Sequence, residues 1–276
     1  MARLTLILAV LLLLLPVSAH AVVLIDENYE VNAPGDLTAK GWAVGQNCNA
    51  YCTLAIVPAP PGRSGSVLRM EYRGLHGGDD SHNAKIGRGL PNAPEIYGRY
   101  YKRTDPVPPA TQSTYYLTTS KQHYLKTDGS ALAPSMSFYT AHIWGGRDLM
   151  FVTQNTADMG ANLTSNDYSN GAKPMADGRW YCVEYHYKMN TPGVANGVQE
   201  MWIDGFQTLG NYNRNFRDLA HATTAFTIIE IYRQAANDQY RYEDDFVLAT
   251  TRVGCSGPPQ PGDTTPPATP AGFVVR

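Results

Sequence analysis

Three short stretches of the chain carry residue types that can remove a proton next to a carboxylate. They are Arg69–Arg73 (RMEYR), Lys121–His123 (KQH) and Ile231–Gln234 (IYRQ). Arginine can neutralise a carboxylate, and histidine can accept a proton near neutral pH. Tyrosine can return a proton to a leaving oxygen. Together these groups suit the cleavage of an acidic polysaccharide by β-elimination, provided that one sheet brings them together.

Strand alternation predicts which of these side chains share a face. Residues two apart in a strand point the same way, so we expect Arg69, Glu71 and Arg73 to project together. In a groove, Glu71 would hold an arginine against a substrate carboxylate. The alternative is a solvated outer face on which Glu71 pairs with charges on the next strand.

The second stretch follows the same rule, and Lys121 and His123 are expected on one face, on a strand that also carries Tyr115. His123 is then either the proton acceptor or a structural histidine. Tyr115 and Trp144 offer rings with polar edges, which suit stacking against sugars.

The third stretch follows an apolar run. Ile229 and Ile231 are expected to face the core, which leaves Tyr232 and Gln234 for a groove. If Tyr232 were instead buried, its hydroxyl would need a hydrogen-bond partner.

The elements that must position these residues are predicted to be strands. Short runs rich in Val, Ile, Tyr, Phe and Thr alternate with Gly, Pro, Asn and Asp, and no long helical periodicity occurs after residue 21. Turn residues at Asn196-Gly197 and Asp204-Gly205 favour a hairpin over 179–204. This pattern indicates an all-β sandwich of two antiparallel sheets, one of them curved into a concave groove. The expected strands are 22–26, 53–57, 66–73, 95–103, 113–124, 135–143, 148–154, 179–189, 198–204, 225–234 and 240–250.

The three stretches, in this order, resemble the signatures of jelly-roll alginate lyases and related heparin- and glucuronan-lyase-like proteins of the concanavalin A-like group. Those signatures read R-x-E-x-R, Q-x-H and Y-F-K-x-G-x-Y-x-Q. The first fits Arg69–Arg73 in full. In the second, Lys121 stands where glutamine is usual, and in the third Ile228 and Glu230 replace lysine and glycine. The resemblance covers most of residues 22–254.

The resemblance implies a mechanism and a site. Arg69 or Arg73, with Lys121, would neutralise a uronate carboxylate. His123 or Tyr232 would take the neighbouring proton, and Tyr232 would protonate the leaving oxygen. The substrate-binding residues would be Glu71, Gln234, Tyr115 and Trp144, and no metal or organic cofactor would be needed.

Other functions stay open on the sequence alone. A non-catalytic carbohydrate-binding module, similar to a lectin, would share the fold and the many tyrosines. A glycoside hydrolase would need two suitably spaced carboxylates, and Glu184 and Glu200 could meet across the 179–204 hairpin. A structural or adhesive role is a further possibility.

Acidic residues stand in the first and last expected strands. They are Asp26, Glu27, Asp244 and Asp245. If these strand ends are neighbours, hard oxygen ligands could hold a structural calcium ion. The alternative is a set of solvated acidic strand ends.

The two ends of the sequence differ from the middle. Residues 1–21 combine Arg3, an apolar run and a final Ala19-His20-Ala21, which predicts a signal peptide cut after Ala21 and a secreted or periplasmic protein. Residues 22–255 form the expected sandwich domain. Residues 256–276 read as a Pro-rich linker or tail, and the last of them resemble the opening of a fibronectin type III domain.

The net charge limits the classes of ligand that the protein can attract, and the cysteines indicate its cellular compartment. A formal net charge of −2 gives no global field for nucleic acid or an anionic membrane, so an acidic polysaccharide would have to meet local positive charge. Four cysteines in an exported chain favour disulfides. The expected pairs are Cys48–Cys52 and Cys182–Cys255, with the other pairings left open.

Overall fold

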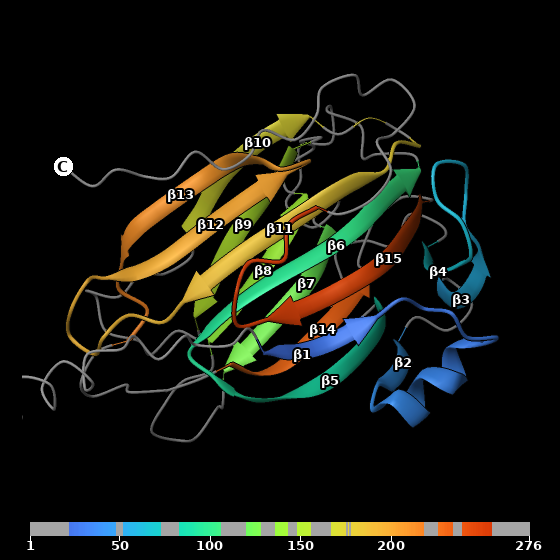
Figure 1. Cartoon of the computed structure of the whole chain (residues 1–276), viewed down its shortest axis with the longest axis horizontal. Helices are drawn as coiled ribbons and strands as arrows, with labels where there is room; N and C mark the ends of the chain where they lie inside the picture. Colours follow the sequence, from blue (N-terminus) through green and yellow to red (C-terminus); the bar gives the residue numbers. More distant parts are fainter. Residues whose placement is uncertain are drawn as a thin grey trace, which may run out of the picture.

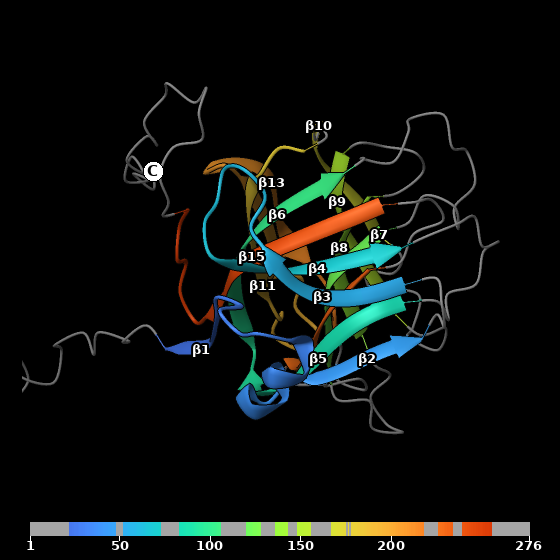
Figure 2. The same cartoon turned by 90° about the vertical axis from the view of Figure 1, so that its right-hand side faces the viewer.

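The protein folds as two stacked antiparallel sheets (Figure 1). The computed structural model describes residues 22–47, 52–72, 83–105, 120–127, 136–142, 148–155, 167–174, 176, 178–217, 226–233 and 239–255. Within these ranges it has fifteen strands and one short 3-10 helix, η1 (Pro34–Lys40), which lies beside β2 (Figure 2). The predicted all-β sandwich is confirmed.

Each sheet collects strands from distant parts of the sequence. The first sheet has the order β13 (Phe206–Arg214), β12 (Gly197–Ile203), β11 (Tyr181–Lys188), β6 (Glu95–Asp105), β15 (Gln239–Ala249), β4 (Ser66–Tyr72) and β3 (Cys52–Pro58), and β1 (Val23–Glu27) also pairs with β15. The second has the order β10 (Asp167–Pro174), β9 (Asp148–Asn155), β8 (Met136–His142), β7 (Ser120–Thr127), β14 (Phe226–Arg233), β5 (Asn83–Ala93) and β2 (Ala43–Asn47).

Four of the observed strands have no counterpart in the sequence-based expectation: β2, β5, β10 and β13. They are rich in Gly, Asn, Lys and Pro, residues that strands usually avoid. The most instructive is β5, which contains Pro91. Its register with β14 shifts between Phe226 and Ile228, the positions opposite Ala93 and Gly89. A shift in register is where a sheet tolerates proline, which has no N–H to donate.

The 179–204 hairpin is confirmed. β11 pairs with β12 from Val183 opposite Ile203 to Lys188 opposite Val198. The turn that follows holds Asp204 at φ 53° and Gly205 at φ 81°. Two successive positive φ values match the right-handed twist of the hairpin strands that they join.

A bulge in β15 decides which of its side chains enter the core. Its register with β6 shifts between Asp244 and Val247, and Asp245 has a φ of 46°. Arg241 and Glu243 before the bulge are therefore buried on the same side as Phe246 after it. Regular alternation would have placed Phe246 on the opposite face from Glu243.

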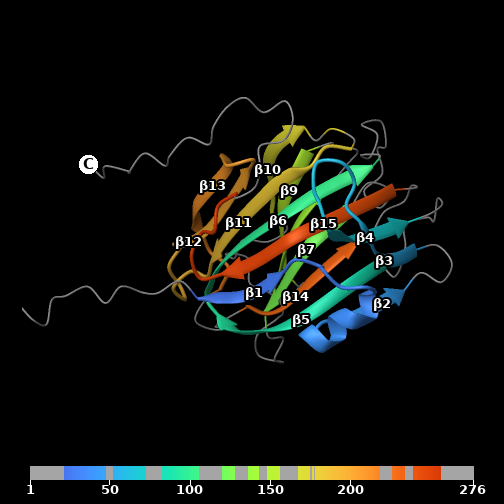
Figure 3. The same ribbon diagram turned by 45° about the vertical axis from the view of Figure 1, so that its right-hand side comes forward.

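Apolar residues from both sheets fill the space between them. Ile25, Leu68 and Met70 from the first sheet join Ile86 and Ile229 from the second in one buried cluster. Figure 3 shows β15 and β6 crossing in front of β14 and β7, which brings the middle strands of the two sheets face to face.

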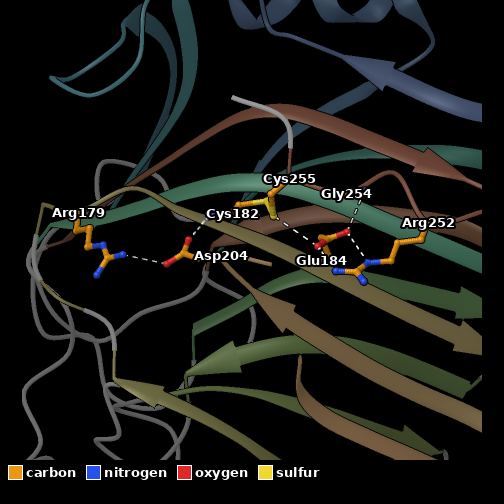
Figure 4. The surroundings of a disulfide bond; sticks show 7 residues. All are labelled: Arg179, Cys182, Glu184, Asp204, Arg252, Gly254 and Cys255. Atoms are coloured by element: carbon orange, nitrogen blue, oxygen red, sulfur yellow. Dashed lines mark hydrogen bonds and ion pairs between the residues drawn. A yellow bond between two sulfur atoms is a disulfide. The ribbon is translucent and has the colours of Figure 1, made fainter. Parts of the chain in front are cut away.

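A disulfide ties the end of the domain to the outer face of the first sheet. Figure 4 shows the bond between Cys182 and Cys255, whose Cα atoms are 6.0 Å apart. Both cysteines pack in a cluster with Trp180 and Tyr101. This predicted pair is confirmed. Cys52 is also disulfide-bonded, but the predicted pair Cys48–Cys52 includes Cys48, which lies outside the described residues.

The described part has no helix that is long and apolar enough to cross a membrane. The predicted signal peptide at 1–21 and the tail at 256–276 both lie outside the described residues.

Gly98 offers a test of the packing between β6 and β11. A Cβ at this position would lie 2.0 Å from the ring of the buried Tyr185. Because the ring has no free space to move into, we expect Gly98→Ala to lower the free energy of unfolding by about 1–3 kcal/mol. Gly89→Ala is the matched control, since nothing lies within 4 Å of its Cβ. Equal denaturant midpoints for the two variants would contradict this packing.

Candidate functional site

The two sheets separate the three predicted motifs. β4, which carries Arg69 and Glu71, belongs to the first sheet, whereas β7 and β14 are neighbours in the second. Leu68 and Met70 are fully buried between the sheets, so Arg69 and Glu71 lie on the outer face of the first sheet. The expectation that one groove collects all three motifs is therefore corrected.

On this outer face Glu71 is buried rather than solvated, at 3% exposed, and Arg69 is half-buried. Arg69 forms an ion pair with Glu71 at 3.4 Å, and Thr53 Oγ1 donates to Glu71 Oε2 at 3.1 Å. The Arg69 guanidinium also lies 5.6 Å from the centre of the Tyr240 ring. Arg73 lies outside the described residues.

His123 lies in the interior rather than in an open groove. Its side chain is 1% exposed, stacks on Tyr100 at 3.8 Å between ring centres, and meets the edge of Phe246 at 4.7 Å. Both ring nitrogens already have protein partners. The expectation of a groove-lining histidine is therefore corrected, because this imidazole is buried among protein groups.

A shift in register interrupts the pairing of β7 with β8 at the second motif. Lys121 pairs with Ala141 on β8, but Tyr124 pairs with Tyr139, so one extra residue of β7 is accommodated between them. Such a bulge breaks the rule that residues two apart share a face. The alternation expected between Lys121 and His123 is therefore not established by this register.

The interior histidine belongs to a hydrogen-bonded network centred on Glu243. His123 Nε2 lies 2.8 Å from Glu243 Oε1, and the Tyr29 hydroxyl donates to the same oxygen at 3.1 Å. Arg241 donates to the other carboxylate oxygen. On the far side of the imidazole, His123 Nδ1 lies 3.1 Å from the Tyr185 hydroxyl.

Burial sets the charge states in this network. Burial lowers the pKa of His123, although Glu243 opposes that shift, so the imidazole is neutral at pH 7. Burial alone would raise the pKa of Glu243, but His123, Arg241 and the Tyr29 hydroxyl lower it below its usual value. The interior therefore holds an ionised carboxylate paired with Arg241. A neutral His123 donates to that carboxylate from Nε2 and accepts from Tyr185 at Nδ1.

Glu27, one of the four calcium candidates, extends the network towards η1. It is 1% exposed and forms an ion pair with Lys40 at 2.7 Å. It also accepts hydrogen bonds from Trp42 Nε1 at 3.1 Å and from the backbone N–H of Tyr29 at 3.0 Å. Its oxygens thus already have protein donors.

The other calcium candidates do not join Glu27 in one set. Asp244 and Asp245 both bind Arg63, whose guanidinium lies over Tyr101 at 3.9 Å, and Asp26 is exposed. Within the described ranges, no group of three or more His, Cys, Asp or Glu residues is arranged to hold a metal ion.

The two carboxylates of the hydrolase hypothesis each bind other side chains. Glu184 lies opposite Trp202 and receives two hydrogen bonds from Arg252, at 3.0 and 2.8 Å (Figure 4). Glu200 lies opposite His186 instead, with its Oε2 2.6 Å from His186 Nδ1. The two carboxylates therefore have separate structural partners.

The third motif leads to a different group of residues. In the register of β14, Ile231 lies between His123 and Ile86, and these three are buried. The next position on β14, Tyr232, lies opposite Lys85, and by alternation belongs to the other face of the sheet.

A second cross-strand pair adjoins Lys85 and Tyr232. In this pair Glu230 of β14 lies opposite Tyr124 of β7. Lys85 and Tyr124 are both half-buried. The side chain of Lys85 runs past Gly45 on β2, where a Cβ would lie 3.7 Å from it. By this register, four positions are neighbours on β5, β14 and β7: Lys85, Tyr232, Glu230 and Tyr124.

Lys85 was missed by the sequence analysis because β5 was not recognised as a strand. The only signal was its alternation with Ala84 and Ile86, which are both buried. The remaining predicted residues, Gln234, Tyr115 and Trp144, lie outside the described residues.

Comparison with known proteins gives structural likeness only. No family model and no curated protein matches the sequence. Among solved structures, alginate lyase Aly36B has 13% identity and a TM-score of 0.55, over 81% of this chain and 95% of that one. An endo-β-1,4-glucuronan lyase from the fungus Trichoderma reesei has 13% identity and a TM-score of 0.57, over 76% and 92%.

The chain has the fold of the jelly-roll polysaccharide lyases. The same fold also occurs in "Cellulose induced protein, Cip1", with 16% identity and a TM-score of 0.53, over 84% of this chain and 100% of that one. A mutant of Aly36B has been solved with an alginate tetrasaccharide (TM-score 0.52, 12% identity). At these identities the likeness establishes the fold and leaves the activity to be argued from the site.

The protonation of His123 gives a test of the interior network. The folded protein keeps His123 neutral below its ordinary pKa of about 6.5, whereas the unfolded chain takes up a proton there. The stability that comes from keeping His123 neutral is therefore fully present above about pH 6.5. It is lost as the pH falls, by up to about 1.4 kcal/mol of unfolding free energy per pH unit. Glu243, with its lowered pKa, acts in the same direction at lower pH.

We expect His123→Gln to flatten the rise in stability between about pH 5 and 7, because glutamine cannot take up this proton. Its amide can still donate to Glu243 and accept from Tyr185. Urea unfolding at a series of pH values measures the slope, and His186→Gln is the control at a histidine on the outer face. An unchanged slope in His123→Gln would show that another group is responsible.

Proposed function

We propose that the protein binds an acidic polysaccharide on the outer face of its second sheet and cleaves it by β-elimination. The observation that carries the proposal is the register of β5, β14 and β7, in which Lys85 lies opposite Tyr232 and Glu230 lies opposite Tyr124. Directly opposed residues of an antiparallel pair have Cβ atoms about 4.5–5.5 Å apart. Lys85 and Tyr232 are therefore close enough to serve one sugar ring.

The chemistry needs one cation and one proton carrier. Lys85 neutralises the uronate carboxylate and so stabilises the negative charge that develops when the C5–H bond breaks. The electron pair forms the C4=C5 double bond, and the glycosidic C4–O bond breaks. Tyr232, deprotonated at the start of this step, takes the C5 proton and passes it to the leaving glycosidic oxygen, so that no proton is left over. One well-placed charge of this kind is worth about 3–4 kcal/mol of barrier.

His123 acts in this proposal as a positioning residue. It lies on the inner side of β7, directly opposite Ile231 of β14. Its hydrogen bonds to Glu243 and Tyr185 connect β7 to the first sheet and fix its position from the interior side. Catalytic groups gain from such rigid support, because small displacements of a reacting group slow the chemistry.

The proposal includes export from the cell. An acidic polysaccharide is an extracellular substrate, and residues 1–21 have the pattern of a signal peptide. The Cys182–Cys255 disulfide supports an oxidising compartment, since such bonds are rare in the cytosol.

A second candidate function is sugar binding without cleavage. Glu230 stands where the resembled lyases have glycine, and it lies two residues from Tyr232 on the same strand. A carboxylate at this position would repel a uronate and so favours a binding module for a less acidic glycan.

The test is to express the full chain, purify the protein and incubate it with alginate, glucuronan and heparin-like glycans. Elimination gives an unsaturated product that absorbs in the ultraviolet, and we expect this absorbance with at least one of the three. Lys85→Ala and Tyr232→Phe should each lower kcat/KM by about 10²- to 10³-fold, because each removes a group that acts on the transition state. Arg69→Ala, on the outer face of the first sheet, is the control and should keep its activity.

The other outcomes separate the alternatives. Binding of a glycan without ultraviolet absorbance would favour the binding module. New reducing ends without that absorbance would favour a hydrolase. Full activity in both Lys85→Ala and Tyr232→Phe would contradict the assignment of the site.

A further inference from the structure

An exposed tyrosine, Tyr212, lies along the outer face of the first sheet and is distant in sequence from the first two motifs. The Tyr212 side chain on β13 is 54% exposed. Its ring passes over Gly210, because a Cβ at Gly210 would lie 2.8 Å from the Tyr212 hydroxyl oxygen. Only a residue without a side chain lets the ring lie this close to the strand.

Hydrogen bonds hold the ring in this position. The Tyr212 hydroxyl donates to Glu200 Oε1 at 2.8 Å. Gln207 Nε2 lies 3.1 Å from both the Tyr212 hydroxyl and Glu200 Oε1. An exposed aromatic ring is thus fixed in place before any ligand arrives, which lowers the entropy lost on binding.

The polar groups beside this ring continue across the sheet. Glu200 Oε2 lies 2.6 Å from His186 Nδ1, and His186 Nε2 lies 3.0 Å from Glu95 Oε1. Tyr97 stacks on His186 with ring centres 3.9 Å apart and planes within 6°. Tyr212, Gln207, Glu200, His186, Glu95 and Tyr97 form a continuous row over β13, β12, β11 and β6, which we call the Tyr212 row.

The chemistry of the Tyr212 row matches a sugar. A fixed aromatic face packs against the apolar C–H face of a pyranose, and adjacent carboxylate and amide groups bond to its hydroxyls. Glu95 and Glu200 are the two carboxylates in the row, and Glu95 is about one third exposed. Burial and then the charge of Glu95 raise the pKa of Tyr97 to about 12, so this tyrosine stays a neutral donor. Two carboxylates disfavour a uronate and favour a neutral sugar.

We propose that the Tyr212 row is a second carbohydrate site, which binds a neutral glycan chain. It lies on the first sheet, whereas the proposed elimination site lies on the second. The two sites differ in the charge that they accept. A protein with both could stay attached to a neutral polysaccharide while it acts on an acidic one in the same material.

The test uses affinity electrophoresis of the full protein in gels that contain soluble neutral β-glucan, soluble xylan or alginate. We expect retardation by at least one of the two neutral glycans. Tyr212→Ala should weaken that binding about tenfold, since stacking of one ring is worth up to about 1.5 kcal/mol. Gly210→Ala should weaken it as well by displacing the ring, while Tyr212→Phe keeps the ring and retains more of the binding.

Phe206→Ala is the matched control, because Phe206 is equally exposed on the same strand, at 58%, but is outside the row. It should bind as the wild type does. No retardation of the wild type by either neutral glycan, or equal binding by Tyr212→Ala, would overturn the proposal. Elimination on whichever of the three acidic glycans the wild type cleaves should be unchanged in Tyr212→Ala, so failure of this site is distinguishable from failure of the proposed lyase activity.

Discussion

The buried carboxylate of Glu243 is the interaction on which the arrangement of the sandwich depends. An ionised carboxylate is tolerated in an apolar interior only when its oxygens are fully hydrogen-bonded. Its donors come from β7, from β15 itself and from Tyr29, which follows β1. Satisfying this one group therefore sets the position of the second sheet against the first. Removing a single partner of such a group typically costs about 3–5 kcal/mol, because the charge remains buried without compensation.

Because of this network, the inner and outer faces of the strands have different roles. On β7 and β14 the inner positions, His123, Leu125 and Ile231, belong to the packed interior, so only the outer positions are left to meet a ligand. On the first sheet the outer face is crossed by ion pairs such as Arg69–Glu71 and Arg252–Glu184. These cations already have carboxylate partners. The proposed acidic-glycan site lies on the second sheet, and the exposed ring of Tyr212 gives the first sheet a different kind of surface.

Much of the fold could be predicted from local pattern. The hairpin of β11 and β12 and the strands β4, β6 and β15 all show alternation or a Val- and Tyr-rich run, and the turn at Asp204-Gly205 has the residues that positive φ values require. β5 escaped prediction because proline and glycine dominate its second half, and only pairing with β14 makes it a strand. The candidate site could not be predicted for the same reason. Because β5 was not recognised as a strand, Lys85 was not considered, and Arg69 was assigned the role of neutralising the carboxylate.

The sequence by itself determined the all-β class and the inward positions of Ile229 and Ile231, because these depend on composition and on alternation within one strand. It favoured the Cys182–Cys255 pair without excluding the other pairings, and the structure chose among them. Only the tertiary structure decided that Arg69 and His123 lie on different sides of the first sheet. Membership of a sheet is a matter of long-range pairing, which a single strand does not encode. The bulge in β15 also changed which residues face inward, and a bulge is visible only against the partner strand.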